Sequence, residues 1–408
     1  MTRLWPAIPA LALLLLSSLP AVAQDLRGHG GPVHALALGP EGLVYSGSFD
    51  TRAIVWDGAI AARITRHHTG AVTAILPLPD GRFATGGHDG VVAIWGDGFE
   101  PLHSEALHPM PVAALAPWPG GLASAGWEGR IALWSGDAPP RYIEAHDGQI
   151  SGLVAYEGGL ASTGADLALR FWDEDGAPGA RIGLDAPVAG LAAEGRALFL
   201  ASPDGSLRRI EPGADRASVQ VTDRPLLSVA ARGDLVVAGG MTGSLWLLAP
   251  RTLEIRREIE TGQGPLWALA ITPDTILSGG NDGLIRRWSH DGAPLGEGSG
   301  PPDPTLVSPR GAEVFRACAV CHTLTPDDGA RAGPTLHGIF GRRIATAEGY
   351  DYSPALRDLD IVWTPETVSE LFEFGPESYT PGSRMPEQRI PSAEDRAELM
   401  KFLQNATR

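Results

Sequence analysis

The chain of 408 residues contains only two cysteines, and a histidine directly follows the second, in the segment Cys318-Ala-Val-Cys321-His322. Such a pair can indicate a disulfide in an exported protein or a thioredoxin-type redox site, but no βαβ pattern surrounds it. C-x-x-C-H is instead the spacing of covalent c-type haem attachment. Two thiols one helical turn apart can reach the vinyl groups on one edge of a porphyrin. We therefore expect one haem c, bound through two thioethers at Cys318 and Cys321, with His322 beneath the iron.

The first 23 residues have the features of a secretory signal peptide. Arg3 precedes an apolar run from Leu11 to Leu16, and small residues at 21–23 predict cleavage before Gln24. Proline and serine residues interrupt the apolar part, which disfavours an uncleaved membrane anchor. We expect a periplasmic protein without a stable membrane span after cleavage.

The chain is acidic, with 48 Asp and Glu residues against 32 Lys and Arg residues and a formal net charge of −16. This charge disfavours nucleic acid and anionic lipid as partners. A neutral or basic partner protein fits better, and the length allows two or three domains.

Residues 24–295 repeat themselves seven times. A tight turn is followed six residues later by a large apolar residue, and these apolar residues are 38 to 40 positions apart: Trp56, Trp95, Trp134, Trp172, Ile210, Leu248 and Trp288. Each unit also contains short alternating apolar segments bounded by Gly and Asp turns, which favours strands. A fixed period of this length predicts an all-β propeller with seven blades.

The repeats resemble WD-repeat β-propellers in Gly28-His29, in the Trp-Asp pairs at 56–57 and 172–173, and in histidines of the same phase at 68, 108 and 146. The resemblance implies a buried hydrogen-bonded network in each blade. It would join His29, Ser46, Asp50 and Trp56 in the first blade, and His68, Thr85, Asp89 and Trp95 in the second. Blades five and six depart from this pattern, with Leu200 and Ala238 at the hydroxyl position and Ile210 and Leu248 at the tryptophan position. We expect apolar packing to hold those two blades.

The other propeller residues give little sign of chemistry. The network explains one histidine per blade better than a metal site does, and His67, His88, His103 and His290 are expected in solvated turns or loops. The first strands should line the central channel with mostly small residues, with His34 and Thr73 as the main polar exceptions. We therefore predict no catalytic residues. Either "QDLRG" near residue 24 or "APLGEG" near residue 293 could close the ring.

A Gly- and Pro-rich linker, residues 296–308, precedes a final all-α domain at 309–408. This domain resembles class I cytochromes c in "GAEVFRACAVCH", "GPTLHGIFGRR", "EGYDYSPAL" and "YTPGSRMP". The resemblance implies that the Pro334 carbonyl accepts a hydrogen bond from His322 and that Met385 is the second axial ligand of the iron. It also implies haem propionate contacts from Arg342, Tyr352 and Trp363. Met400, His337 or an open position are the alternatives to Met385.

Two departures concern the surface and the distal side of this domain. Phe372 stands where the family usually has a tyrosine, and Lys401 is the sole lysine of the chain, so the lysine ring of mitochondrial cytochromes is absent. Residues 307–408 hold eleven Lys or Arg against fifteen Asp or Glu. The resemblance implies an electron carrier, and we expect the propeller to dock its redox partner. The alternatives are a propeller oxidoreductase with its own cytochrome outlet and a haem-tethered interaction scaffold.

Overall fold

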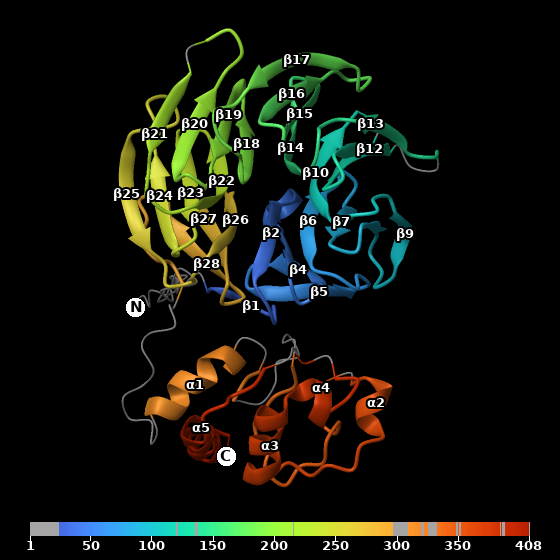
Figure 1. Ribbon diagram of the computed structural model, residues 1–408, viewed down its shortest axis with the longest axis vertical. Helices are drawn as coiled ribbons and strands as arrows, with labels where there is room; N and C mark the ends of the chain where they lie inside the picture. Colours follow the sequence, from blue (N-terminus) through green and yellow to red (C-terminus); the bar gives the residue numbers. More distant parts are fainter. Residues whose placement is uncertain are drawn as a thin grey trace, which may run out of the picture.

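The computed structural model describes residues 24–119, 121–134, 138–214, 216–296, 309–319, 322–324, 333–347, 350, 352–383, 385 and 388–407. The expected signal peptide, most of the expected linker and Cys321 lie outside these residues. The described chain forms a ring of β-sheets followed by a helical part (Figure 1).

The ring consists of seven four-stranded antiparallel sheets, which confirms the seven-bladed β-propeller. Blade one contains β2 (Val33–Leu38), β3 (Val44–Ser48), β4 (Arg52–Asp57) and β5 (Ile60–Arg66), with a short 3-10 helix at Pro40–Gly42. Blade two contains β6 (Val72–Pro77), β7 (Phe83–Gly87), β8 (Val91–Trp95) and β9 (Pro101–Ala106). Blade three contains β10 (Val112–Trp118), β11 (Gly121–Gly126), β12 (Arg130–Trp134) and β13 (Arg141–Glu144).

The later blades repeat this arrangement. Blade four contains β14 (Ile150–Tyr156), β15 (Gly159–Gly164), β16 (Ala168–Trp172) and β17 (Pro178–Gly183). Blade five contains β18 (Gly190–Glu194), β19 (Ala197–Ala201), β20 (Ser206–Ile210) and β21 (Ala217–Gln220). Blade six contains β22 (Leu226–Arg232), β23 (Leu235–Gly240), β24 (Ser244–Leu248) and β25 (Ile255–Glu260). Blade seven contains β26 (Leu266–Ile271), β27 (Thr275–Gly280), β28 (Leu284–Ser289) and β1 (Leu26–Arg27).

The outer position of blade seven is filled from both ends of the propeller. β1 runs antiparallel to β28, with Leu26 opposite Ile285. Further along β28, Pro294 forms a bridge with Trp288, and the Leu295 N–H donates to the Arg287 carbonyl at 2.9 Å. Both candidate closing segments therefore contribute, and the N-terminal one supplies the strand.

The propeller core is divided into seven apolar clusters, each between two neighbouring blades. Between blades one and two, for example, Tyr45, Phe83 and Trp95 are almost fully buried, and Phe83 stacks on Trp95 with ring centroids 5.9 Å apart. Because a single blade has two apolar faces, it buries both only when it has a neighbour on each side. The stability of the ring therefore depends on its closure.

The expected network is present in the first blade. Trp56 donates its indole N–H to Ser46 Oγ at 2.7 Å, and His29 Nε2 lies 2.7 Å from the same oxygen. His29 Nδ1 lies 3.1 Å from Asp50 Oδ2. Donation from Nδ1 to the carboxylate leaves Nε2 to accept the serine O–H, so every buried polar group of this set has a partner. Blades two and four repeat the pattern with His68, Thr85, Asp89 and Trp95, and with His146, Ser162, Asp166 and Trp172.

Blade seven builds the same network with a residue that the sequence did not single out. Gln263 accepts a hydrogen bond from Ser278 Oγ at 2.6 Å and donates to Asp282 Oδ1 at 3.2 Å, while Trp288 donates to Ser278 Oγ at 2.8 Å. The amide of Gln263 replaces an imidazole because it also offers an acceptor atom, its oxygen, and a donor atom, its NH2 nitrogen. In blades five and six, Leu200, Ile210, Ala238 and Leu248 are at most 3% exposed and pack in apolar clusters, as expected.

Two histidine expectations are confirmed only in part. His103 is exposed, as expected, but it lies within strand β9 rather than in a turn. His88 lies in the expected turn after β7, but it is half-buried, because its ring packs between those of Phe49 and Trp127, with centroids 5.7 Å and 5.5 Å away. The other two, His67 and His290, are exposed or nearly so and make hydrogen bonds at the surface.

The helical part contains α1 (Pro309–Ala319), α2 (Pro354–Arg357), α3 (Pro365–Phe374), α4 (Pro376–Tyr379) and α5 (Ala393–Ala406). Thr364 begins α3 with a capping box, and the Ser392 side chain caps α5 by accepting the Asp395 N–H. α5 packs on α1 through Phe402 and Phe315, whose ring centroids are 5.2 Å apart, and Leu399 and Leu403 are buried beside them. No helix among the described residues is long and apolar enough to cross a membrane.

Candidate haem site

His322 lies one turn beyond the buried Cys318 at the end of α1, and its N–H donates to the Cys318 carbonyl at 2.9 Å. Its ring atom Nδ1 lies 2.7 Å from the Pro334 carbonyl oxygen, the contact that the sequence predicted. A proton on Nδ1 leaves the lone pair of Nε2 to bind a metal. The imidazole therefore has the tautomer that an axial ligand requires.

The neighbouring glycine leaves room for this ring. A Cβ atom built on Gly333 would lie 2.5 Å from His322 Cε1 and 2.7 Å from Nδ1. Real Cβ atoms do not approach other heavy atoms so closely. Glycine at 333 therefore allows the 333–334 backbone to reach the imidazole at hydrogen-bonding distance.

Arg342 stabilises the loop that follows Pro334. Its guanidinium donates to the Thr335 carbonyl at 2.6 Å and to the His337 carbonyl at 3.0 Å. Burial lowers the pKa of Arg342, and Tyr352 acts in the opposite direction only when its phenol is ionised. The sequence predicted a propionate contact for Arg342 but not these two carbonyl contacts, which depend on how the loop folds.

Two of the three predicted propionate residues, Arg342 and Trp363, are neighbours. The backbone N–H of Trp363 donates to the Arg342 carbonyl at 2.9 Å, and the Gly341 N–H donates to the Trp363 carbonyl at 2.8 Å. Tyr352 packs edge-on against Tyr350 with centroids 4.8 Å apart. The propionate roles of Arg342, Tyr352 and Trp363 stay predictions.

Met385 lies in the loop before α5 and is half-buried. It packs against the apolar cluster that contains Cys318 and Phe372, and its N–H donates to Ser383 Oγ at 3.0 Å. Ser353 Oγ donates to the Gly382 carbonyl at 2.8 Å, which joins this loop to the segment before α2. Met400, in contrast, is 7% exposed within α5 and belongs to the core.

The described donor set fits a haem c. It contains a buried cysteine, an imidazole with its Nδ1 side occupied, and a thioether that packs against the same core. Cys321, the second predicted thioether position, lies outside the described residues. Among the described residues there is no cluster of three His, Cys, Asp or Glu side chains that could hold another metal ion.

Family models agree with both parts of the chain. The "Cytochrome c" model matches residues 308–407, and the "WD domain, G-beta repeat" model matches residues 21–57 and 61–96. The fold and the site therefore define a class of protein in which a WD-repeat propeller is followed by a helical haem-binding domain.

Curated cytochromes c match the same C-terminal region. Cytochrome c of Gibberella zeae is 38% identical over 100 residues, which are 24% of this chain and 93% of the relative. Cytochrome c of Stellaria longipes is 39% identical over 100 residues, 24% of this chain and 92% of the relative. That of Arabidopsis thaliana is 38% identical over 100 residues, 24% of this chain and 88% of the relative. Through this region the chain belongs to the cytochrome c family.

A solved structure of the computationally designed Ika8 protein resembles the larger part of the chain. It has a TM-score of 0.53 and 20% identity, and the match covers 65% of this chain and 99% of that protein. At this identity the likeness concerns the fold alone.

Proposed function

We propose that this protein is a periplasmic monohaem cytochrome that transfers single electrons, with His322 and Met385 as axial ligands and its propeller as the docking module for a redox partner. The observation that carries the proposal is the 2.7 Å contact between His322 Nδ1 and the Pro334 carbonyl. It supports an imidazole held in one orientation and one tautomer for a ligand on its Nε2 side.

A haem c in this site would supply reversible one-electron chemistry at its iron. The residues of the chain have three tasks. Cys318 and Cys321 would anchor the group, Pro334 and Arg342 would keep the imidazole and its loop in place, and Met385 would supply the second protein ligand. Because the chain would supply both ligands, His322 and Met385 would need little rearrangement between the two oxidation states.

The propeller supports the docking role through its fold class, because WD-repeat propellers are typical protein-interaction modules. A partner held by the blades would meet the haem at an effective concentration set by the linker. Periplasmic export is supported by the signal-peptide features of the first 23 residues.

The test is a visible absorption spectrum of the full-length protein from a haem-loading periplasm, oxidised, reduced and then exposed to carbon monoxide. We expect a low-spin haem that resists extraction by acidified solvent and does not bind carbon monoxide. Met385→Ala should remove the methionine-to-iron band and open the site to carbon monoxide, whereas Met400→Leu should retain both properties. Ready binding of carbon monoxide by the unaltered protein would contradict the proposed ligation.

A further inference from the structure

The innermost strands of the propeller share a β-bulge near their start. In six blades, the second residue of the innermost strand has no partner in the pairing with the next strand of the blade. These residues are His34, Thr73, Ala113, Ser151, Leu227 and Trp267. A bulge removes a residue from the hydrogen-bond ladder and redirects its side chain. All six of these residues line the central cavity, so the bulges create one ring of side chains around it.

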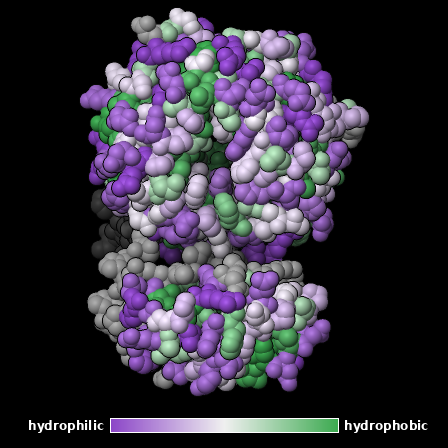
Figure 2. All heavy atoms as spheres, viewed as in Figure 1, coloured by the Kyte–Doolittle hydropathy of each residue, from purple (hydrophilic) through white to green (hydrophobic). Residues whose placement is uncertain are grey.

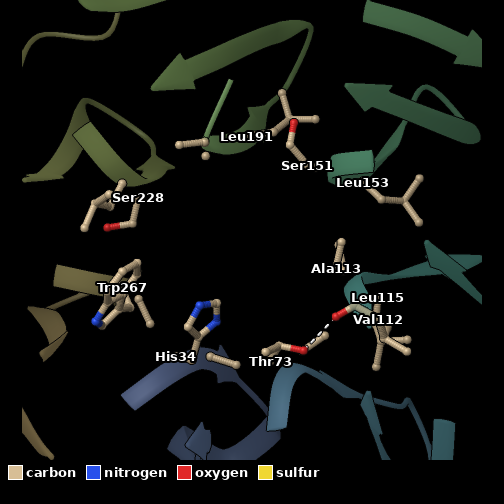
Figure 3. A pocket seen from close by; sticks show the side chains of 18 of the residues that line it. His34, Thr73, Val112, Ala113, Leu115, Ser151, Leu153, Leu191, Ser228 and Trp267 are labelled. Carbon is tan, nitrogen blue, oxygen red and sulfur yellow. Dashed lines mark hydrogen bonds between the residues drawn. The ribbon is translucent and has the colours of Figure 1, made fainter. Parts of the chain in front are cut away.

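This ring is strongly asymmetric. Trp267 and His34 stack on each other on one side, with centroids 5.5 Å apart and planes inclined by 19°. Ala113 and Ser151 are small residues elsewhere in the ring, and Figure 3 shows Ser151 across the opening from His34 and Trp267. The space between the two sides belongs to a cavity of about 530 Å³. Figure 2 shows this hollow in the middle of the ring, with hydrophobic residues inside it.

The described lining of the cavity contains no Asp, Glu, Lys or Arg residue. Burial lowers the pKa of His34 to about 4, so its imidazole is neutral at neutral pH. An uncharged wall with an aromatic platform favours an uncharged, flat group, because a buried charge without a partner is costly.

The platform continues onto the surface as an aromatic arc of Trp267, His34, Phe49, His88 and Trp127. Successive ring centroids along the arc are 5.5, 5.3, 5.7 and 5.5 Å apart. The arc spans four neighbouring blades, from blade seven to blade three. Phe49 is 43% exposed although it is a large apolar residue.

More apolar side chains are exposed in loops at the same end of the blades as Phe49, with Met110 before β10, Leu167 between β15 and β16, and Met241 between β23 and β24. Met110, Leu167 and Met241 are 46%, 37% and 38% exposed. The turn that carries Met241 lies against the loop that enters blade six, with the Met241 N–H donating to the Pro225 carbonyl at 2.9 Å. Exposed apolar residues that surround a hollow are typical of contact with another protein.

The rest of the rim is acidic. Asp147, Asp185 and Asp223 are exposed in the loops that lead into the innermost strands of blades four, five and six. Arg224 lies 3.8 Å from Asp223 and offsets one of these charges. Together with the net charge of −16, this rim favours a partner surface with basic residues.

We propose that this mouth is the docking surface for the redox partner, which inserts one aromatic side chain against the Trp267–His34 platform from a protruding segment with basic flanking residues. The inference rests on the docking role in the proposed function and specifies the surface and the chemistry of the partner. The inserted ring would stack on the platform, while the basic flanks would contact the acidic part of the rim.

The test measures binding of short capped peptides to the full-length holoprotein by ligand-observed NMR at millimolar concentration. The probes are acetyl-Arg-Trp-Arg-amide, acetyl-Glu-Trp-Glu-amide, acetyl-Arg-Ala-Arg-amide and free indole. We expect binding of the first peptide, and a loss of about tenfold in its affinity in Phe49→Ala and His34→Ala, as for a residue at the centre of an interface. Phe99→Ala is the matched control, because Phe99 is 73% exposed near β9 and away from the cavity lining.

The proposal would be overturned if acetyl-Arg-Trp-Arg-amide did not bind, or if Phe49→Ala bound it with the affinity of the unaltered protein. It would also be overturned if the Glu-flanked or the Ala-centred peptide bound as tightly as acetyl-Arg-Trp-Arg-amide. Equally tight binding of free indole would indicate a small-molecule site instead. Phe49 is exposed, so its variant keeps the test valid even if His34→Ala fails to fold. The measurement does not depend on the haem ligands. Peptide binding by a protein that also binds carbon monoxide would therefore contradict the ligation and leave this surface standing.

Discussion

Leu26 lies opposite Ile285 in blade seven, so a strand from the beginning of the described chain completes the sheet built by the last repeat. Leu26 is fully buried in the cluster between blades seven and one, together with Val33 and Trp56. The ring is therefore closed by hydrogen bonds and by apolar burial at the same place. Opening this seam would expose the faces of two blades at once.

We expect Leu26→Ala to lower the free energy of unfolding of the propeller by about 2–5 kcal/mol, the usual cost of a cavity left by a buried leucine. Thermal unfolding followed by tryptophan fluorescence measures the change. Ile60→Ala is the control, since Ile60 is 72% exposed on β5. Equal stability of Leu26→Ala and the unaltered protein would mean that β1 does not hold the ring closed.

The blade count and the main networks could be predicted from the sequence because they depend on repeated residue types at a fixed spacing. Closure could not be decided, because β1 has two residues and no periodicity, and because residues 294–295 also pair with β28. Gln263 was missed since it shares hydrogen-bonding capacity, not residue type, with the histidines. Its position 25 residues before Trp288, against 27 for His29 and Trp56, was the available signal.

The candidate site was predictable to a similar degree. The His322–Pro334 contact was implied by the resemblance of two local segments to class I cytochromes c. The contacts of Arg342 with two carbonyl groups, and the aromatic arc at the channel mouth, depend on loop conformation and on neighbouring blades. Neither can be found from spacing along one segment.

The Thr85 hydroxyl is the centre of the network in blade two, where it binds both Trp95 Nε1 at 2.9 Å and His68 Nε2 at 2.8 Å. We expect Thr85→Val, which has nearly the same shape, to destabilise the propeller by about 1–3 kcal/mol because two buried polar groups lose their partner. Chemical denaturation measures the loss. Ser104→Ala, which removes an exposed hydroxyl bonded to His67, should change little. A neutral effect of Thr85→Val would show that the network does not stabilise its blade.

We expect Asp89 to make the stability of the propeller depend on pH in the acid range. Burial alone would raise the pKa of Asp89, but the hydrogen bond and charge of His68 and the N–H groups of Thr69 and Val91 outweigh burial and lower it. A carboxyl whose pKa is lower in the folded state stabilises the fold above its unfolded pKa of about 4, and this stability is lost as pH falls below that value.

We therefore expect Asp89→Asn to be less stable than the unaltered protein at pH 7 and to lose less stability on acidification from about pH 5 to pH 2, the range in which the carboxylate is protonated. Urea denaturation at a series of pH values measures the free energy of unfolding of both proteins and the slope of that free energy against pH. Asp57→Asn, at an exposed position at the end of β4, should retain the slope of the unaltered protein. Identical slopes for Asp89→Asn and the unaltered protein would remove Asp89 as a cause of the acid sensitivity.

Gly333→Ala tests whether close approach of the backbone fixes the predicted haem ligand. The new Cβ would lie 2.5 Å from His322 Cε1, so the imidazole or the 333–334 backbone has to move and the 2.7 Å contact with Pro334 should lengthen. We expect a lower reduction potential or a partly high-spin spectrum, measured by visible absorption during a redox titration, and only a minor change in propeller unfolding. Gly183→Ala is the control because its Cβ would meet nothing within 4 Å. If Gly333→Ala keeps the spectrum and the reduction potential of the unaltered protein, the contact with Pro334 does not position His322.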